Sequence, residues 1–168
     1  APAGAARPMS TPGPTRTDLG VVAGAAVVAH HQALLAGAVY DDPMILGATI
    51  VQEGGRALDV FSPPAYFDLA PGAHELSWRP VATLTHLLDV AFVGTGTVWP
   101  HLVNVALHAI AAALLVRVAG GFGWSRLAAC VAGLVFAVHP LASEAVGVIT
   151  FREDLLGARR RGRTVRQH

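Results

Sequence analysis

The chain has 168 residues, of which 53% are hydrophobic and only 14% are charged, and its formal net charge is +1. A typical soluble domain has about 25% charged residues, so this composition excludes an ordinary soluble protein and indicates an integral membrane protein. All twelve basic residues are arginines and five lie in the last ten positions, so no nucleic-acid-binding surface is predicted, and the single cysteine excludes an intrachain disulfide.

The N-terminal part divides into a tail and a first apolar segment. Residues 1–18 are rich in Ala, Pro, Gly, Ser and Thr, and they predict a disordered cytoplasmic tail because they cannot bury enough apolar surface to fold alone. Residues 19–40 form the first apolar segment. A cleaved signal peptide is the alternative, since an arginine precedes the segment and small residues follow it. The apolar hairpin later in the chain favours a retained membrane span with the N-terminus inside.

Residues 41–98 are predicted to form the first outer loop, which is acidic, proline-rich and largely irregular. Within it, Pro80 opens a helix that runs to about residue 92, because proline is accepted in a first helical turn. Helical spacing puts one set of apolar residues on one side: Val81, Leu84, Leu87, Leu88 and Ala91. Thr85, His86 and Asp89 share another side. About thirteen residues are too few to span a bilayer, so an amphipathic helix on the membrane surface is predicted.

Two further apolar segments follow almost back to back, at about 99–118 and 124–140. Arg117 and Arg126, near their connection, are the only charged residues between Asp89 and Glu144. This pattern is typical of a membrane hairpin, and arginine is enriched on the cytoplasmic side, so the outer ends of both segments should face the extracytoplasmic side. The predicted fold class is all-α, with about three transmembrane helices plus the surface helix, as a fragment of a larger multi-span fold.

Residues 19–157 therefore form one partial membrane domain in this prediction. Phe151 to Leu156 resemble the start of a further helix that re-enters the membrane. The remaining residues, 158–168, are strongly basic, and their charge on the outer side opposes the predicted topology. We expect this tail to be the abnormal ending of a truncated chain.

Ionisable residues beside membrane spans are energetically costly and by default indicate a site or a pathway. The first such cluster is the adjacent pair Asp41 and Asp42, directly after the first span. Two neighbouring carboxylates cannot point the same way, so one can act as a general base while the other orients the loop or meets a cation. A solvated loop start or a helix cap is the alternative.

A second cluster combines Arg79 with His101, Asn104 and His108, which share one face of the second span. The planar donors of arginine suit phosphate oxygens, and histidines can join it around a lipid phosphate. Membrane anchoring by Arg79 and interhelical hydrogen bonding by the others are the alternatives. A zinc site is rejected, because asparagine is a weak ligand and no third strong ligand is fixed nearby.

A third cluster follows the last apolar segment and consists of His139, Glu144, Arg152, Glu153 and Asp154. A structural ion pair at the membrane boundary is its simplest interpretation.

In order and separation, these clusters resemble a known family. The runs VYDDP, SWRPVATLTHLLD, HLVNVALHA and VFAVHPLASEAVGVITFREDLL are similar to the N-terminal membrane part of the transmembrane-and-tetratricopeptide-repeat O-mannosyltransferases, within the wider GT-C group of glycosyltransferases. The resemblance covers about residues 19–157. It implies a polyprenyl-phosphate sugar as donor and transfer, with mannose expected, to a protein Ser or Thr hydroxyl on the extracytoplasmic side.

The resemblance also implies roles for individual residues. Asp41 and Asp42 match the presumed catalytic carboxylates, and the other matching positions, at which the donor lipid phosphate would bind, are Arg79, His101, Asn104, His108, His139, Glu144, Arg152 and Asp154. The implied reaction is a direct displacement in which a carboxylate deprotonates the acceptor hydroxyl. No cofactor is implied, and a divalent metal is left open.

The sequence also departs from the family. Ala142 stands where the family often has a second histidine, an aromatic residue common after the Glu-Ala-Val run is replaced near Gly147 and Val148, and no 34-residue helical repeat is present. Two other function classes therefore stay open: a non-catalytic membrane subunit or interaction module, and a proton or ion pathway. In each case the predicted location is a multi-pass membrane protein whose active face is extracytoplasmic and whose partners include membrane lipid.

Overall fold

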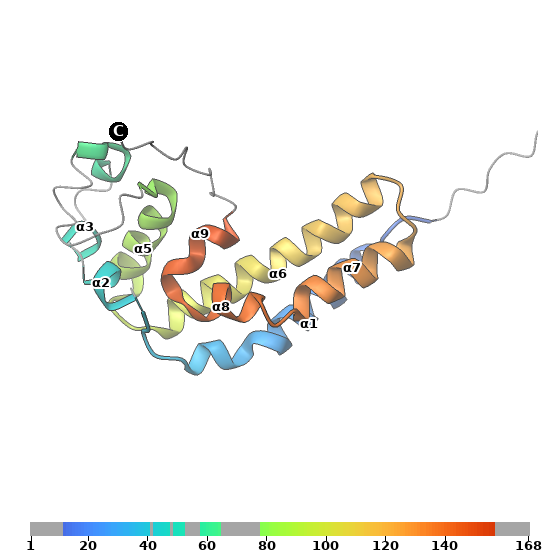
Figure 1. Cartoon of the computed structure of the whole chain (residues 1–168), viewed down its shortest axis with the longest axis horizontal. Helices are drawn as coiled ribbons and strands as arrows, with labels where there is room; N and C mark the ends of the chain where they lie inside the picture. The colour runs from blue at the N-terminus through green and yellow to red at the C-terminus, as the bar shows by residue number, and fades with distance from the viewer. Residues whose placement is uncertain (1–11, 41, 48, 53–57, 65–77, 157–168) are drawn as a thin grey trace, which may run out of the picture.

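The computed structural model describes residues 12–40, 42–47, 49–52, 58–64 and 78–156, and these residues form helices and turns without a β-strand (Figure 1). The predicted all-α class is therefore confirmed. The predictions for residues 1–11, for Asp41 and for the basic tail from 158 onward concern residues outside these ranges.

Three helices pack into an elongated bundle. Helix α1, Arg16–His30, continues as the 3-10 helix η1, His31–Leu35, and it packs against α6, Val98–Gly121, and α7, Arg126–Val138. Thr15 and Asp18 begin α1 with a reciprocal capping box, in which each side chain accepts the backbone N–H of the other residue. The Ser125 hydroxyl begins α7 by accepting the backbone N–H of Ala128 at 3.3 Å.

Small side chains fill the interior of the bundle and large ones point outward. The buried cluster consists of Val22, Ala26, Ala109, Ala112, Val116, Ala119, Ala129 and Ala137. Leu114 on α6 and Leu127 on α7 are among the exposed large hydrophobic side chains. Helix packing in lipid gains little from apolar burial and depends on close approach of backbones, so small residues inside and large residues outside are the pattern expected of a membrane bundle.

Two helices are long and apolar enough to cross a membrane within the described residues. They are Arg16–Leu35, with 20 residues, and Val98–Gly121, with 24 residues. The third predicted span, at 124–140, corresponds to the 13-residue apolar helix α7, which at 1.5 Å per residue is about 20 Å long. The two long helices support membrane association.

The remaining elements gather around the first half of α6, at the end of the bundle opposite the α6–α7 connection (Figure 1). We call them the head region. Its members are α2 (Asp42–Leu46), α3 (Thr49–Gln52), η2 (Asp59–Phe61), α5 (Pro80–Val93), α8 (Ala142–Gly147), η3 (Ile149–Phe151) and α9 (Arg152–Leu155). Segments that follow the first apolar segment and segments that follow the third are thus brought to one place.

Helix α5 has the bounds expected from its sequence, but the side that carries its polar residues is turned inward. An amphipathic helix at the membrane surface turns its polar side to water, whereas His86 and Asp89 are buried here and Val81, Leu88 and Phe92 are exposed. Leu87 packs with Val51 and Val60 in a small apolar cluster on another side of the helix. The physical reason for the inward polar side is a buried cation on α9, described below.

Candidate functional site

Asp42 joins two distant parts of the chain through backbone hydrogen bonds. Its side chain is fully buried. Oδ2 accepts the backbone N–H of Val39 at 3.0 Å and of Ile149 at 3.3 Å, and Oδ1 accepts the N–H of Thr150 at 2.9 Å. Ile149 lies 107 residues farther along the chain. The loop after η1 is therefore tied to η3, and both oxygens of this carboxylate are engaged.

The turn before Asp42 is sharply bent. Tyr40 has a φ of 51°, in the left-handed region that non-glycine residues seldom adopt. The backbone N–H of Asp42 donates to the Val39 carbonyl at 3.0 Å, while the Asp42 side chain accepts the Val39 N–H, so the two residues hold the turn from both sides. Such a conformation costs on the order of 1–3 kcal/mol and persists only where its surroundings fix it. Asp41 belongs to this turn in sequence and lies outside the described residues.

Arg152, the first residue of α9, is the centre of the polar interior of the head region. Its side chain is fully buried. Nη1 lies 2.6 Å from Oδ2 of Asp89 on α5, Nε donates to Oδ1 of Asn104 at 2.8 Å, and Nη2 donates to the Pro100 carbonyl at 3.1 Å. Burial lowers the pKa of Arg152, and the nearby Asp89 carboxylate acts in the opposite direction. One guanidinium thus links α9 to both α5 and α6.

Both the oxygen and the nitrogen of the Asn104 side-chain amide form hydrogen bonds. While Oδ1 accepts from Arg152, Nδ2 donates to the Val148 carbonyl at 3.0 Å. Val148 immediately precedes η3, so Asn104 holds on α6 the same segment that Asp42 holds from the other side. Because an amide can donate only from nitrogen and accept only at oxygen, these two partners fix its orientation.

Asp89 and His86 on α5 complete this interior, although neither was among the site residues predicted from the sequence. Oδ1 of Asp89 accepts the indole N–H of Trp99 at 3.0 Å. Burial lowers the pKa of His86 to about 3, and the positive charge of Arg152 adds to this effect, so His86 is neutral at physiological pH. The available signal was a lone carboxylate in an otherwise apolar helix, which by default indicates a specific buried partner.

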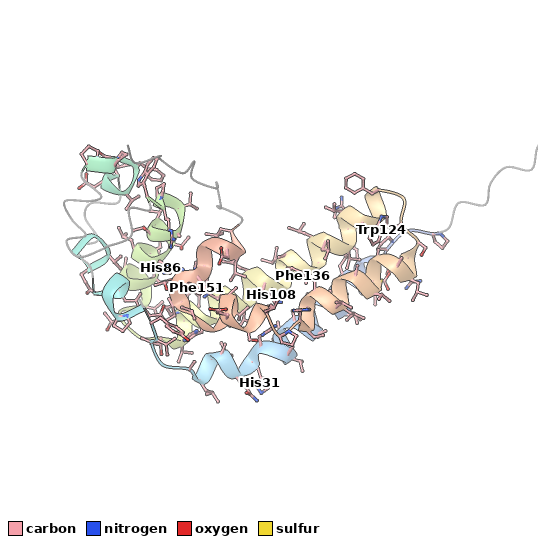
Figure 2. All side chains as sticks on the ribbon, in the orientation of Figure 1. His31, His86, His108, Trp124, Phe136 and Phe151 are labelled. Atoms are coloured by element: carbon pink, nitrogen blue, oxygen red, sulfur yellow. The ribbon has the colours of Figure 1, made fainter. Side chains whose placement is uncertain are left out.

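The two predicted histidines of α6 lie in different surroundings. His101 is fully buried, and neither of its ring nitrogens has a hydrogen-bond partner among the described residues. His108 lies farther along α6, next to Phe136 (Figure 2). Its Nε2 is 3.1 Å from the Ala137 carbonyl, as is Nε2 of His30 on α1. Ala137 is in the last turn of α7, where carbonyls lack helical partners, so the two histidines satisfy the end of that helix.

The other predicted residues lie at the surface. Arg79 is half-buried and directly precedes α5. His139 is exposed, and its Nδ1 accepts the backbone N–H of Leu141 at 3.2 Å in the turn after α7. Glu144 and Asp154 are also exposed. The structure therefore brings together Asn104 and Arg152, and it ties Asp42 to the residues just before Arg152, while His139, Glu144 and Asp154 lie at the exposed surface.

The described residues contain no group of three His, Cys, Asp or Glu side chains arranged to hold a metal ion. The polar interior can instead fix the relative positions of the loop after η1, the start of α6 and the segment before α9. Its hydrogen bonds are charge-assisted and lie in surroundings of low dielectric constant, where such bonds are strong.

Comparison with known proteins gives one consistent group of relatives. The chain is 35% identical over 158 residues to Protein O-mannosyl-transferase Tmtc1 of Drosophila melanogaster, and the aligned region covers 89% of this chain and 18% of that protein. It is 36% identical over 137 residues to Protein O-mannosyl-transferase Tmtc2 of the same organism, and the aligned region covers 77% of this chain and 14% of that protein. Protein O-mannosyl-transferase F38B6.6 of Caenorhabditis elegans is 32% identical to it over 124 residues, and the aligned region covers 70% of this chain and 18% of that protein.

The chain thus spans less than a fifth of the length of these curated relatives. No family model matches the chain. No solved structure matches it either.

Proposed function

The chain belongs to the TMTC family of protein O-mannosyl-transferases, and from this we propose that it forms the donor-side part of a membrane glycosyltransferase. The proposed reaction moves a mannosyl group from a polyprenyl-phosphate donor to a Ser or Thr hydroxyl of a protein acceptor. It takes place on the extracytoplasmic side, which in the proposed topology is the side of the head region. The wider GT-C assignment, the donor lipid and the multi-pass topology are parts of the same proposal.

The observation that carries this proposal is the hydrogen bonding of Asp42. Through Ile149 and Thr150 it joins the acidic turn after the first span to the segment that leads into Arg152. These are two of the sequence runs on which the family resemblance rests. A transfer site assembled from both runs requires that they meet, and this contact supports their meeting.

The two adjacent acids receive different roles in this proposal. Both oxygens of Asp42 accept backbone N–H groups, so its carboxylate is occupied in holding the turn. We therefore assign to Asp41 the role of general base and to Asp42 the positioning of the turn.

The chemistry then proceeds as a single displacement. The Asp41 carboxylate takes the proton of the acceptor hydroxyl, and the acceptor oxygen forms a bond to the anomeric carbon of mannose. The bond between that carbon and the phosphate oxygen breaks, and the polyprenyl phosphate leaves with the electron pair. Cationic and N–H donors near the phosphate would offset the charge that grows on it.

Exposure divides the residues proposed for donor binding. Arg79 is partly accessible and His139 is exposed, so we assign these two side chains to contact with the lipid phosphate. The exposed carboxylates Glu144 and Asp154 repel a phosphate, so we place them toward sugar hydroxyl groups. His101, Asn104, His108 and Arg152 are buried, and we assign them the support of the site.

The test is a chimera in which this chain replaces the aligned segment of the Drosophila Tmtc1 relative, purified in detergent with a polyprenyl-phosphate mannose donor and a protein acceptor. Asp41→Asn should abolish transfer, measured by mass spectrometry of the acceptor, without changing the amount of folded protein. Glu53→Gln, another acid of the same predicted outer loop, serves as the matched control and should leave transfer intact. Undiminished transfer by Asp41→Asn would refute the assigned base.

A second candidate function is a non-catalytic membrane module. The hydrogen bond of Arg152 to Asn104 and its ion pair with Asp89 favour it, because such a network needs no ligand. This alternative predicts that Asp41→Asn is silent while Asp42→Asn reduces the folded amount of the chain.

A further inference from the structure

Helix α5 contributes a residue to which the family resemblance assigned no role. We propose that Asp89 is a positioning residue for the transfer reaction: through Arg152 it fixes η3, and through η3 it fixes the turn that carries the paired acids. This inference rests on the proposed function.

Arg152 is buried and depends on Asp89 for its counter-charge. Arg152 has no exposed side-chain surface, and Asp89 is the described carboxylate in contact with it, at 2.6 Å. A guanidinium withdrawn from water is strongly unfavourable unless a counter-charge and hydrogen-bond acceptors replace the solvent. Asn104 and the Pro100 carbonyl supply neutral acceptors, and Asp89 supplies the charge. Arg152 therefore occupies this position because Asp89 is there.

Arg152 is connected to Asp42 through η3. Arg152 comes directly after η3, and the backbone N–H groups of the first two residues of η3 donate to Asp42. If the guanidinium left its place, η3 would lose its anchor on α5 and α6, and the donors that hold Asp42 would move with it. The contacts thus run from Asp89 through Arg152 and η3 to Asp42.

The buried ion pair between Asp89 and Arg152 supplies an orientation that apolar packing would not supply. Replacing a buried ion pair with apolar residues of similar size is often neutral or stabilising, so stability alone gives weak grounds for one. An ion pair has directional geometry that an apolar contact lacks. Trp99 strengthens this geometry by donating to the second oxygen of Asp89, which fixes the plane of the carboxylate.

The test uses the same chimera and measures kcat and the donor KM separately. Asp89→Asn should lower kcat at least tenfold and leave the KM for polyprenyl-phosphate mannose within about twofold, because the base moves while the accessible donor-binding residues do not. Asp89→Glu keeps the charge and should restore most of kcat. The matched control is Asp18→Asn, which removes another Asp–Arg pair, with Arg126, at the opposite end of the bundle, and should leave both constants unchanged.

A paired apolar substitution separates positioning from mere stability. In Asp89→Leu/Arg152→Leu no charge is left unpaired, although Oδ1 of Asn104 loses its donor. The folded amount should therefore exceed that of Asp89→Asn, even if Asp89→Asn fails to fold. We expect kcat to stay low in this double variant. Recovery of kcat together with folding would overturn the inference, as would a normal kcat in Asp89→Asn. If Asp41→Asn is also silent, the proposed function fails; if Asp41→Asn abolishes transfer and Asp89→Asn does not, the inference alone fails.

Discussion

The bundle and the head region share helix α6, yet their interiors are built from different chemistry. Around the second half of α6, the contacts to α1 and α7 are made by alanine, valine and glycine. Around its first turns, Asn104 contacts Arg152, which pairs with Asp89 on α5, and a small apolar cluster packs on another side of α5. The bundle thus gains its stability from close approach of backbones, and the head region from charge-assisted hydrogen bonds.

The two interiors should therefore tolerate substitutions differently. Close-packed small residues leave no room for added atoms, but they contain few groups that need a partner. A buried polar network tolerates changes of volume better than the loss of one partner, because each loss leaves another polar group unsatisfied. The head region should therefore be sensitive to the removal of polar atoms and the bundle to the addition of apolar ones.

The largest expected effect comes from Asn104→Leu. The substitution leaves the Nε of Arg152 without its acceptor and removes the amide donor to the Val148 carbonyl, which keeps the backbone N–H of Phe151 at 3.3 Å. Because the group left unpaired is a buried charge, we expect a loss of about 3 kcal/mol in the free energy of unfolding. Reversible unfolding of the chain in mixed detergent micelles measures it. Leu102→Ala, an exposed position of the same helix, is the control. A change in Asn104→Leu no greater than in this control would contradict the importance of the network.

A smaller effect is expected from Gly133→Val in the bundle. A Cβ at Gly133 would overlap the side chain of Val116 and come within 3.2 Å of Val22, because α7 crosses both other helices there. Overpacking of this kind costs about 1–3 kcal/mol. The same unfolding measurement applies, with the exposed neighbour Leu134→Val as control. If both variants were equally stable, the close contact of α7 with its neighbours would be in doubt.

The head region should also lose stability in acid, through His86. Its pKa is about 3 in the folded chain and 6.5 in the reference state, so the unfolded state binds more protons between these values. Above pH 6.5, His86 is neutral in both states and does not make the free energy of unfolding depend on pH. As the pH decreases from 6.5 toward 3, the free energy of unfolding falls by at most about 1.4 kcal/mol per pH unit. Unfolding between pH 7 and pH 5 checks this. His86→Leu should flatten the dependence in that window, and an equal slope in both proteins would assign it to other groups.

The smallest expected effect is that of Asp18→Asn. Its bidentate contact with Arg126, at 2.8 Å for both pairs of atoms, looks as strong as the pair in the head region. Arg126 is well exposed at the bundle end, where water and salt screen the attraction, so we expect no measurable change in unfolding. A clear loss would show that exposure does not separate the two ion pairs.

Part of the fold could be predicted from the sequence because it depends on local patterns. The two long apolar helices and the start of α5 at Pro80 follow from runs of hydrophobic residues and from the lack of a backbone donor in proline. The clusters of ionisable residues were also visible as exceptions within apolar surroundings. Asp89 was visible too, but its position in a predicted surface helix made solvent the expected partner.

The grouping of polar residues could not be predicted in the same way. The sequence grouped Asn104 with His108, which lies one helical turn away, whereas the structure pairs Asn104 with Arg152, 48 residues later, and His108 with the end of α7. Neighbours on a helix face share a direction, but they do not share a partner when the helix is long enough to contact two different regions.

Composition and residue order are enough to predict that this chain is helical, suited to a membrane and a member of the TMTC family. The folded chain was needed to find that backbone donors hold Asp42, that α5 turns its charge inward, and that Asp89 is the counter-ion of Arg152. A buried charge is stable only beside a partner of opposite charge, and which residue becomes that partner depends on how distant segments meet.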